Sequence, residues 1–540
     1  MNYFTLKRSF FLVYSNKCHE EFEKIDKFLE ILEQSGVGKL IEQEQKNNDN
    51  FELGRKGYNP YNLMTTVIYC FSKFKSSLRE IEQLCIFDVR VAYLMEQETP
   101  NYTVISDFIN RYILPYTYEI FTMITKAIID EFKIDISTQY IDGTKVEANA
   151  NKYKFVWKPT TYHKKLDMKI KELLNDIDYK WTSNNWIKAY QLKEILTEYV
   201  ERESIDINNL PIGKGKRKSI QQKIYIKGKD YLLKLLEYEE KENICGENRN
   251  SYYKTDKDAT AMMLKEDYYS KLSNDFHAAY NFQAMVASGF ITMFGIFQDR
   301  NDYYTFTPMI DLYYKYYDKY PENISADSGY GIYTNYKYIR EHDIGNYVKF
   351  QSWKGESSGK NPQLFYTFDD GIMCLNTNIG EEIKFKNTHQ RSKDGKLYKF
   401  TGCNSCNYSY KCKAKMKKEN KNKDYRVVEI IPDYELLKEQ ARNNLLSPKG
   451  IEIRINRSIQ VEGDFGQIKW NMGYDRIRRR GIDKVTCEIM LMCLGRNIRK
   501  LFTLFDGNEV KSGFWKVPSD LKKEKFPSVK QKKKKELSRN

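Results

Sequence analysis

The stretch STQYIDGTKVEANAN, residues 137–151, decides the fold. Its β-branched and aromatic residues are typical of a strand, and we expect Asp142 at the end of that strand. A second short apolar segment, NISADSGYG at residues 323–331, leads to Asp327 and then to serine and glycine, as a strand does before a loop and a helix. If the two strands are neighbours, their carboxylates lie together at one edge of a sheet.

Helical periodicity appears on both sides of the first strand. Residues 19–36 and 62–85 repeat apolar side chains at helical spacing and predict a helical N-terminal domain over residues 1–134. Residues 153–250 are rich in Lys and Glu with the same periodicity, and they predict a helical insertion. The basic residues of the N-terminal helices favour either a helix-turn-helix contact with DNA or ordinary packing with a solvated basic face.

Strand and helix signals alternate in the second half of the chain. Residues 278–297 predict two strands with a turn at Ser288 and Gly289, residues 309–320 a helix, and residues 345–350 a further strand. The segment 351–450 is polar and bears glycines and cysteines, which is typical of an insertion. A last helical pattern runs from about Ile451 to Leu504, and a lysine-rich tail covers 516–540.

The charge balance points to a polyanionic partner. Lys and Arg number 89 against 73 Asp and Glu, a formal net charge of +16. Lysines that only keep a large surface solvated explain this surplus as well as nucleic-acid binding does. With 540 residues, 41% hydrophobic residues and 12 prolines, the composition excludes a disordered or collagen-like chain and allows three or four folding units.

No segment of the sequence is typical of a membrane span or a secretion signal. The longest apolar run, residues 284–297, is interrupted by polar and glycine residues and falls short of the roughly 20 residues that a spanning helix needs. No signal-peptide cleavage pattern follows the first apolar residues. We therefore expect the protein to stay inside the cell.

Three cysteines form a candidate metal site. Cys403, Cys406 and Cys412 have the spacing C-x2-C-x5-C, and Cys374 is available as a fourth thiol. In a reducing compartment this pattern favours a tetrahedral structural Zn²⁺ over disulfides, and a set of unliganded thiols is the open alternative. With five histidines and no paired spacing among them, a histidine-based site has little support.

The catalytic motifs of several other enzyme classes are missing from the sequence. The sequence has no G-x-S-x-G elbow, no Gly-rich phosphate loop and no H-E-x-x-H pair. Cleavage of DNA by two divalent cations needs only carboxylates on separate elements that bridge and flank the metals. Asp142 and Asp327 on strands, with an acidic residue on a helix, satisfy that requirement.

Several segments, in this order, resemble transposases of bacterial insertion sequences, in the group around insertion sequence 1182 within the larger assembly related to insertion sequence 4. The matching words are GYNPYNLMTTVIY, SSLREIEQLC and PNYTVISDFINRY in the N-terminal part; IDGTKVEANANKYKFVW at the first aspartate; TDKDATAMMLKEDYY and HAAYNFQAMV in the centre; ADSGYGIYTNYKYI at the second aspartate; and RSIQVEGDFGQIKWNMGYDRIRRRG with CEIMLMCLGRNIRK at the glutamate. They span most of the chain from about residue 57 to 500.

The resemblance implies an α/β fold with a ribonuclease-H-like core, a helical N-terminal domain for DNA ends and two insertions. Asp142, Asp327 and Glu462 would be the catalytic triad, with Mg²⁺ or Mn²⁺ as cofactor. The implied division is 1–134 (N-terminal domain), 135–350 (first part of the core, with the insertion 153–250), 351–450 (cysteine-bearing insertion), 451–515 (glutamate helix) and 516–540 (tail). Double-stranded DNA, a homodimeric active complex and a cytoplasmic, nucleoid-associated location are implied as well.

The related transposases also carry a Tyr, Arg, Glu, Lys signature around the glutamate. Lys469 stands seven residues after Glu462, as the signature asks, and on a helix this spacing places both on one face. Ser458 replaces the expected Arg, with Arg457 one place away, and Ile455 stands where Tyr would be.

Basic residues near this signature are candidate DNA contacts. They are Lys469, Arg457, Arg476, Arg478, Arg479 and Arg480. Contact with the DNA backbone is the favoured interpretation because arginines beside the site would neutralise phosphates, and plain solvation is the alternative.

Two other functions remain open from the sequence. One is a DNA-binding protein from a decayed or domesticated element, without chemistry. The other is a ribonuclease-H-like nuclease that cleaves DNA but does not join it. The two carboxylates with Glu462 favour the transposase over the first of these.

Overall fold

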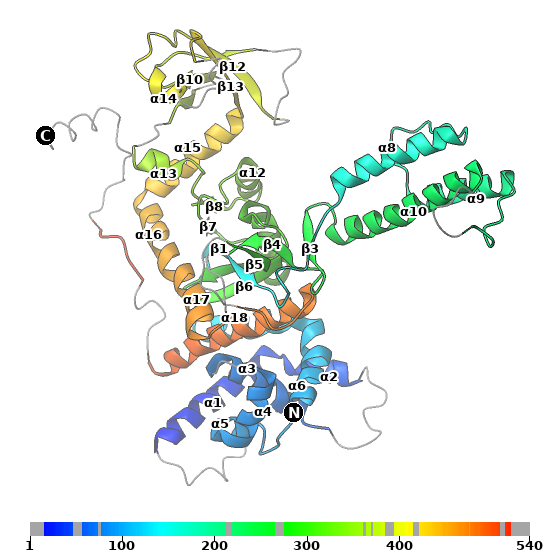
Figure 1. Ribbon diagram of the computed structural model, residues 1–540. Coiled ribbons are helices and arrows are strands. Elements are labelled where there is room, and N and C mark those ends of the chain that lie inside the picture. Colours follow the sequence, from blue (N-terminus) through cyan, green and yellow to red (C-terminus); the bar gives the residue numbers. More distant parts are fainter. Residues whose placement is uncertain are drawn as a thin grey trace.

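A mixed β-sheet lies at the centre of the molecule (Figure 1). The computed structural model describes residues 16–46, 57–73, 77–211, 218–264, 275–359, 363–368, 371–383, 394–413, 421–474, 476–507 and 514–519. Within these residues the sheet has six strands: β1 (Thr138–Glu147), β4 (Thr260–Met263), β5 (Phe276–Ala287), β6 (Phe290–Phe297), β7 (Asn323–Ser325) and β8 (Gly345–Asn346). The chain is therefore a mixed α/β protein, as the sequence predicts at the level of fold class.

The strands of this sheet run both ways. β6, β5 and β1 pair antiparallel to one another in that order, with β4 against the start of β5, whereas β7 and β8 continue parallel to β1. The predicted hairpin is confirmed: Ser288 and Gly289 link β5 to β6 with φ of 50° and 75°. Two consecutive residues with positive φ form the tight turn whose twist suits a hairpin.

Helices connect and cover the parallel part of the sheet. η4 (Asp302–Tyr304) and α11 (Phe306–Tyr317) follow β6, and α12 (Tyr333–Glu341) joins β7 to β8. The prediction of a helix over 309–320 is confirmed by α11. The predicted strand 345–350 shrinks to Gly345–Asn346, because β7 itself ends at Ser325. Backbone hydrogen bonds from Tyr347 to Ile324 and from Lys349 to Ala326 continue the same alignment beyond the two strands.

The N-terminal part is helical, and it shares one hydrophobic core with the sheet. Its elements are α1 (Asn16–Ser35), α2 (Gly38–Lys46), α3 (Pro60–Lys73), α4 (Leu78–Phe87), α5 (Val89–Leu94), α6 (Tyr102–Phe108), η2 (Ile109–Ile113), η3 (Leu114–Tyr116) and α7 (Thr117–Glu131). Local signals fix their starts: Pro60 opens α3, and Ser77 with Glu80 forms a capping box at α4.

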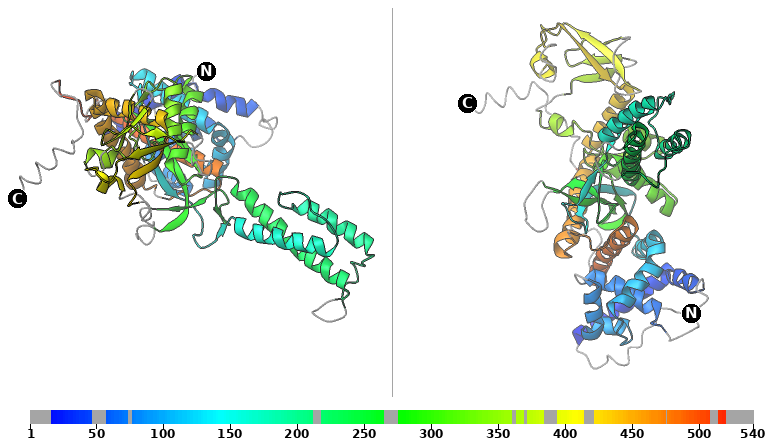
Figure 2. Two further views of the ribbon diagram at one scale, coloured as in Figure 1. Left: turned by 90° about the horizontal axis from the view of Figure 1, so that it is seen from above. Right: turned by 45° about the vertical axis from the view of Figure 1, so that its right-hand side comes forward.

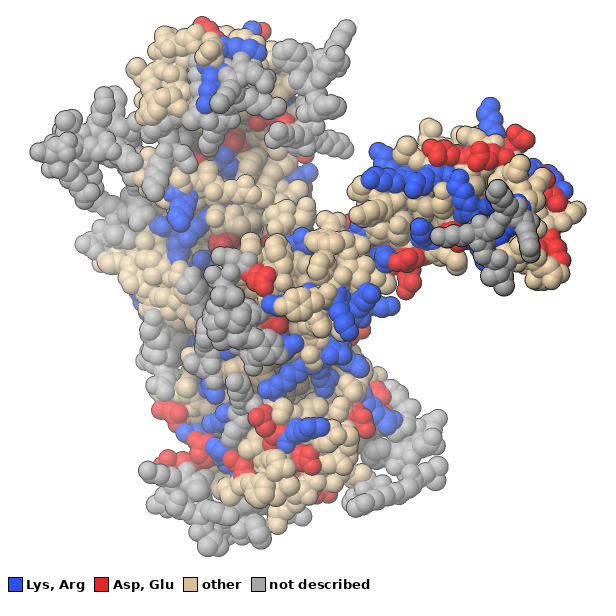
Figure 3. All heavy atoms as spheres, viewed as in Figure 1, with Lys and Arg blue, Asp and Glu red and all other residues tan. Residues whose placement is uncertain are grey.

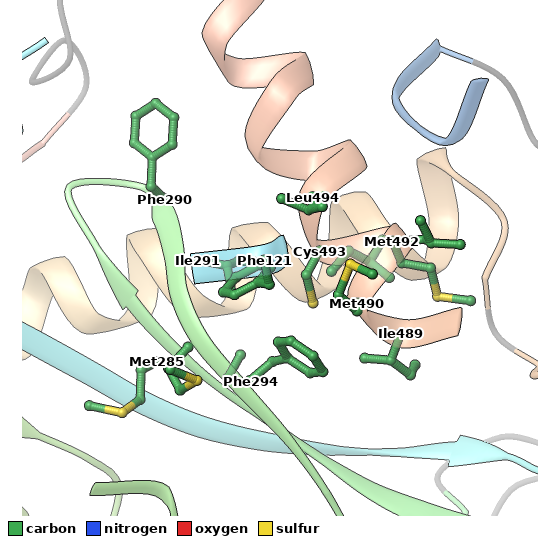
Figure 4. Packing of buried hydrophobic residues seen from close by; sticks show 14 of the residues in the cluster. Phe121, Met285, Phe290, Ile291, Phe294, Ile489, Met490, Met492, Cys493 and Leu494 are labelled. Atoms are coloured by element: carbon green, nitrogen blue, oxygen red, sulfur yellow. The ribbon is translucent and has the colours of Figure 1, made fainter. Parts of the chain in front are cut away.

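Helix α18 (Ile482–Phe505) joins the two parts. It contacts α3 and α7 on one side and β6 on the other. Figure 4 shows Met490 and Cys493 of α18 beside Phe121 of α7 and Phe294 of β6. Burial of these apolar side chains stabilises both parts together, since each large side chain removed from water contributes about 1.5–3 kcal/mol.

A helical arm projects from the sheet, as Figures 1 and 2 show from three directions. It consists of α8 (Thr160–Asp176), α9 (Ala189–Arg202) and α10 (Ile220–Cys245), and its two ends form the ribbon β2 (Phe155–Trp157) and β3 (Ser251–Tyr253). The arm has a hydrophobic cluster of its own, including Leu166, Ile170, Leu192 and Leu235. Its packing is therefore separate from the main core.

A small lobe carries the cysteines at the far end of the molecule from the N-terminal helices (Figure 1). After α13 (Trp353–Ser357) it contains β9 (Phe365–Phe368), β10 (Gly371–Cys374), β11 (Glu381–Glu382), β12 (Lys396–Thr401), α14 (Ser409–Lys413) and β13 (Tyr425–Ile430). The next helix, α15 (Pro432–Leu446), buries Leu437, Ala441 and Leu445 in the main core. Although it lies within the range 351–450, α15 therefore packs with the sheet.

The last segment differs from the single helical pattern predicted for 451–504. The structure has α16 (Pro448–Arg457), the π-helical turn η6 (Ser458–Glu462), α17 (Gly463–Gly466) and the π-helical turn η7 (Gln467–Asn471), and then a loop before α18. Gly473 and Gly481 have φ of 68° and 82° in that loop, which ends helical geometry there. The predicted tail lies outside the described residues from 520 onward. None of the described helices is long and apolar enough to cross a membrane.

Candidate active site

Asp142 and Asp327 come together through the pairing of β1 with β7. The parallel register pairs Tyr140 with Ser325, and each aspartate follows two residues later. The two carboxylates are close enough for the charge of Asp327 to act on Asp142. Asp327 follows the end of β7 by two residues, close to the strand end expected from the sequence. Asp142 does not end its strand, because the antiparallel pairing of β1 with β5 continues to Glu147. Asp142 instead lies two residues beyond Tyr140, the last residue of β1 that pairs with β7.

The surroundings of Asp142 raise its pKa above the ordinary value. Burial is the largest cause, and the negative charge of Asp327 acts in the same direction. The Arg457 guanidinium opposes both, since its Nη1 donates to Asp142 Oδ2 over 3.1 Å, and the Gly143 amide donates to Oδ1 over 2.8 Å. A further cation at this edge would therefore favour the charged form of Asp142.

Arg457 is a buried residue at the end of α16, not a surface arginine. Its hydrogen bond ties α16 to β1, and the following turn η6 contacts both β1 and β5. Gln460 of that turn accepts a hydrogen bond from the Gly289 amide over 2.9 Å. The segment that carries Glu462 therefore lies against the sheet beside Asp142.

Glu462 is the last residue of η6. Its backbone is described, but its side chain lies outside what the structure describes. The role of Glu462, and the predicted common face of Glu462 and Lys469, therefore stay predictions.

Lys469 lies on η7 and reaches back to the first strand. Its Nζ donates to Thr144 Oγ1 over 2.5 Å and to the Lys145 carbonyl over 2.8 Å. The side chain is half-buried rather than fully solvated. Its charge is thus held two residues along β1 from Asp142.

A buried polar network supports the carboxylates from β5. Gln283 accepts a hydrogen bond from the Tyr330 hydroxyl over 2.5 Å and donates to Asn281 and Asp302. Asp302 also binds Lys145 Nζ at 2.8 Å. Tyr330 follows Asp327 by three residues and is fully buried. The network therefore connects both carboxylate-bearing segments to the middle of the sheet.

Sequence reasoning missed this network. Its one available signal was the presence of Asn281 and Gln283 inside an otherwise apolar strand. Gln283 bonds to Asp302 and Tyr330, which lie 19 and 47 residues away, so no local pattern reveals these partners.

Asp142 and Asp327 fit the ligand chemistry of Mg²⁺ or Mn²⁺. Both are carboxylates, the hard oxygen donors that these cations take, and they meet at one edge of the sheet. Among the side chains that the structure describes, no group of three or more His, Cys, Asp or Glu is arranged to hold a metal ion. The Glu462 side chain is not among them, so the described residues account for two of the three predicted ligands.

A basic groove separates the N-terminal helices from the loop before α18. Its volume is about 590 Å³, and its lining includes Arg79, Tyr102, Arg478, Arg479, Arg480 and Lys484. Figure 3 shows Lys and Arg side chains gathered where the sheet meets the N-terminal helices. Two of the predicted DNA contacts, Arg478 and Arg479, thus lie in one groove.

The loop before α18 carries Arg476, Arg478, Arg479 and Arg480, and we call it the arginine loop. Its backbone amides hold it in place. The buried Glu488 accepts hydrogen bonds from the amides of Arg478 and Arg479, the shorter one over 2.8 Å. Arg476 pairs instead with Glu147 of β1, with 3.7 Å between Nε and Oε1. The Arg478 guanidinium lies over the Tyr474 ring, 5.8 Å from its centre.

The four predicted cysteine ligands line one small cavity of about 30 Å³ in the cysteine-bearing lobe. The Tyr408 amide donates to Cys406 Sγ over 3.4 Å, and Arg426 Nη1 contacts Cys412 Sγ. The thiols of this part of the described chain are grouped but not arranged as a closed ligand set.

Part of the chain matches a known protein family. Residues 374–502 match the family model described as Transposase DDE domain. The match supports a DDE transposase. It begins at Cys374, includes Glu462 and Lys469, and ends in α18, so Asp142 and Asp327 lie outside it. No curated protein and no solved structure shows significant similarity to the chain.

Proposed function

We propose that this protein is a transposase that cleaves DNA strands at the ends of an insertion sequence and joins them to a target, with Asp142, Asp327 and Glu462 as the metal-binding triad. The observation that supports the proposal most is the pairing of β1 with β7, which brings the segments of Asp142 and Asp327 together so that the charge of Asp327 acts on Asp142. The segment with Glu462 packs on the same two strands, β1 and β5, that bear Asp142 and its supporting network. A ribonuclease-H-like core is the fold we propose for this arrangement.

The residues of the chain divide the work. When bound, Mg²⁺ or Mn²⁺ would activate the attacking oxygen and stabilise the leaving one. Arg457 holds Asp142 in place and favours its charged form through the bond to Oδ2. Lys469, anchored on β1, contributes a positive charge for the phosphate next to the scissile bond. Arg478 and Arg479 bind the DNA backbone in the basic groove, where phosphate neutralisation supplies most of the affinity.

The proposal extends to the transposase group, the source and location of the protein, its oligomeric state and its domain division. We place the chain in the insertion sequence 1182 group, with a bacterial source and a nucleoid location set by its DNA substrate. A homodimer in the active complex would bring two element ends together. The division at residues 134, 350, 450 and 515 is proposed with it, with α15 packing on the core side.

The direct test uses purified protein, Mg²⁺ and DNA that carries the ends of the element. Wild-type protein is expected to nick the ends and join them to a second DNA. Asp142→Asn, Asp327→Asn and Glu462→Gln should each lose nicking by several orders of magnitude, because each removes a ligand charge. Asp311→Asn on α11 is the matched control, since Asp311 bonds to Tyr338 instead. Wild-type behaviour of Asp142→Asn would refute the triad, and nicking without joining would indicate a plain nuclease.

A second function, DNA binding without chemistry, is favoured by the basic groove alone. It predicts a gel shift with end DNA and no cleavage with Mg²⁺ or Mn²⁺. In that case Arg479→Ala should weaken binding while Asp142→Asn leaves every measurable property unchanged.

We also propose structural Zn²⁺ at Cys374, Cys403, Cys406 and Cys412, which line one cavity. Purified protein should contain about one zinc per chain, and Cys406→Ser should lower that content while Cys85→Ser, a buried cysteine of α4, does not. A zinc-free wild-type protein that keeps a folded lobe would favour unliganded thiols.

A further inference from the structure

Three large aromatic side chains are exposed at the base of the arm. They are Tyr153, Phe155 and Trp157, which we call the aromatic ribbon, with exposed fractions of 80%, 45% and 55%. Phe155 and Trp157 are the ends of β2, so their alternation places both on one face, and their rings lie 5.7 Å apart edge to face. Three neighbouring aromatics left in water are unusual unless a ligand covers them.

Lysines surround the aromatic ribbon. Lys152 Nζ lies 5.5 Å from the Tyr153 ring centre, and Lys154 is exposed between the aromatics. Lys254 is exposed on the paired segment, where its amide bonds to the Lys154 carbonyl. Asp275, which pairs with Lys152 at 3.2 Å, is an acidic residue at this surface. The balance of charge around the rings is therefore positive.

The aromatic ribbon continues the basic groove. Asn149, which leads from β1 to the ribbon, donates to the Arg478 carbonyl over 2.7 Å and accepts from Arg480 Nε over 2.8 Å. Asn149 and Arg480 also line the groove itself. Asn149 therefore connects the groove with the aromatic ribbon, and a strand that leaves a duplex held in the groove has the ribbon close by.

We propose that the aromatic ribbon binds unpaired nucleotides of the DNA substrate by base stacking. This inference rests on the proposed function, because it assumes that DNA occupies the groove. In a duplex each base face is covered by its neighbours, so exposed aromatic rings select bases that have left the stack. Aromatic rings interleaved with lysines are the combination that binds single strands, since stacking holds the bases and the ammonium groups hold the phosphates. A protein partner fits less well because lysine is depleted in protein interfaces.

The test measures binding of the full chain in EDTA, so that no cleavage interferes. The probes are a labelled single-stranded oligothymidylate, a duplex, and the same duplex with an unpaired extension. The double variant Tyr153→Ala/Trp157→Ala should bind the single strand and the extension roughly tenfold or more weakly, and the plain duplex as wild type does. Tyr153→Phe/Trp157→Phe should restore binding because the ring faces return.

Phe87→Ala, an exposed aromatic on α4, is the control and should leave all three affinities unchanged. Equal binding of the single strand by wild type and the double variant would overturn the inference. A difference in sedimentation between the double variant and wild type, both without DNA, would also overturn it, because the aromatic ribbon would then be a protein interface. A different outcome is possible for the wild-type protein: it could bind the single strand, fail to bind the plain duplex, and show no cleavage in the assay with Mg²⁺. That result would count against the transposase function and would still support the stacking surface.

Discussion

Gly143 is the residue next to Asp142, and it owes its place to a neighbour rather than to its own flexibility. A Cβ at this position would lie 2.0 Å from Gln283 Nε2 and 2.7 Å from its Cδ. Gln283 is fully buried and bonded to Tyr330, so it cannot move aside without breaking the network beneath Asp327. The absence of a side chain at residue 143 therefore lets β5 support both carboxylates.

Gly143→Ala should lower the free energy of unfolding by about 1–3 kcal/mol, the usual cost of overpacking a buried site. The nicking rate should fall by more than the loss of folded protein explains, because the displaced Gln283 releases Tyr330. Urea denaturation and nicking assays measure the two effects. Gly57→Ala is the control, since a Cβ there would meet no atom within 4 Å. Wild-type stability and activity in Gly143→Ala would show that Gln283 has no such role.

Arg457 controls the protonation of Asp142. Without its guanidinium, burial and the charge of Asp327 would raise the pKa of Asp142 further above the ordinary value. Metal binding needs the carboxylate, so the acid limb of the pH–rate profile should move to higher pH in Arg457→Met. Arg340→Met, which removes a partner of Asp433 instead, should leave the limb in place. An unshifted limb in Arg457→Met would assign Arg457 a purely structural role.

At the scale of elements, Glu488 links α18 to the arginine loop. Burial raises the pKa of Glu488, although the Arg478 and Arg479 amides favour its charged form. The folded state therefore holds the proton more tightly than the unfolded state. Between the unfolded pKa, about 4.5, and the raised folded value, stability should fall as pH rises.

Glu488→Gln removes this titration. The difference in unfolding free energy between variant and wild type should therefore shift in favour of the variant as pH rises above 4.5, and stay constant below it. Urea titrations at a series of pH values measure that difference. The exposed Glu30→Gln is the matched control. A pH-independent difference would mean that Glu488 has the same pKa in both states.

Turns, helix starts and strands were predictable from the sequence wherever the types of a few neighbouring residues determined them. The Ser288–Gly289 turn, the start of α3 at Pro60 and the strands before Asp142 and Asp327 follow from residue types within a few positions. The break between η7 and α18 was not predictable from periodicity, because apolar side chains such as Tyr474 and Ile477 continue into the loop and are buried there. The Arg457–Asp142 and Gln283–Tyr330 bonds depend on tertiary pairing, which a single sequence does not reveal.

At the scale of the whole molecule, the N-terminal helices and the sheet form one unit, while the arm forms another. The main hydrophobic cluster includes residues of α1, α3, α7, the sheet and α18, whereas the arm cluster draws only on residues 166–235. Close backbone packing holds the main unit together: a Cβ on Gly495 of α18 would lie 2.4 Å from the Phe71 carbonyl oxygen of α3. The basic groove lies between the same two parts, so its shape depends on that contact.

Gly495→Val should therefore push α3 away from α18, and it should weaken both the fold of the main unit and duplex binding in the groove. Backbone atoms cannot rotate out of the way, so a loss of several kcal/mol is expected, with a fall of about 2–4 °C in the main melting transition for each kcal/mol. Gly228→Val is the matched variant, because its Cβ would instead meet Leu196 and Leu173 inside the arm. In Gly228→Val, the amides of α8, α9 and α10 should lose protection from hydrogen exchange while those of α3 and β6 keep it. In Gly495→Val, the amides of α3 and β6 should lose protection while those of the arm keep it. Loss of protection across the whole chain in both variants would mean that the arm and the main unit unfold as one.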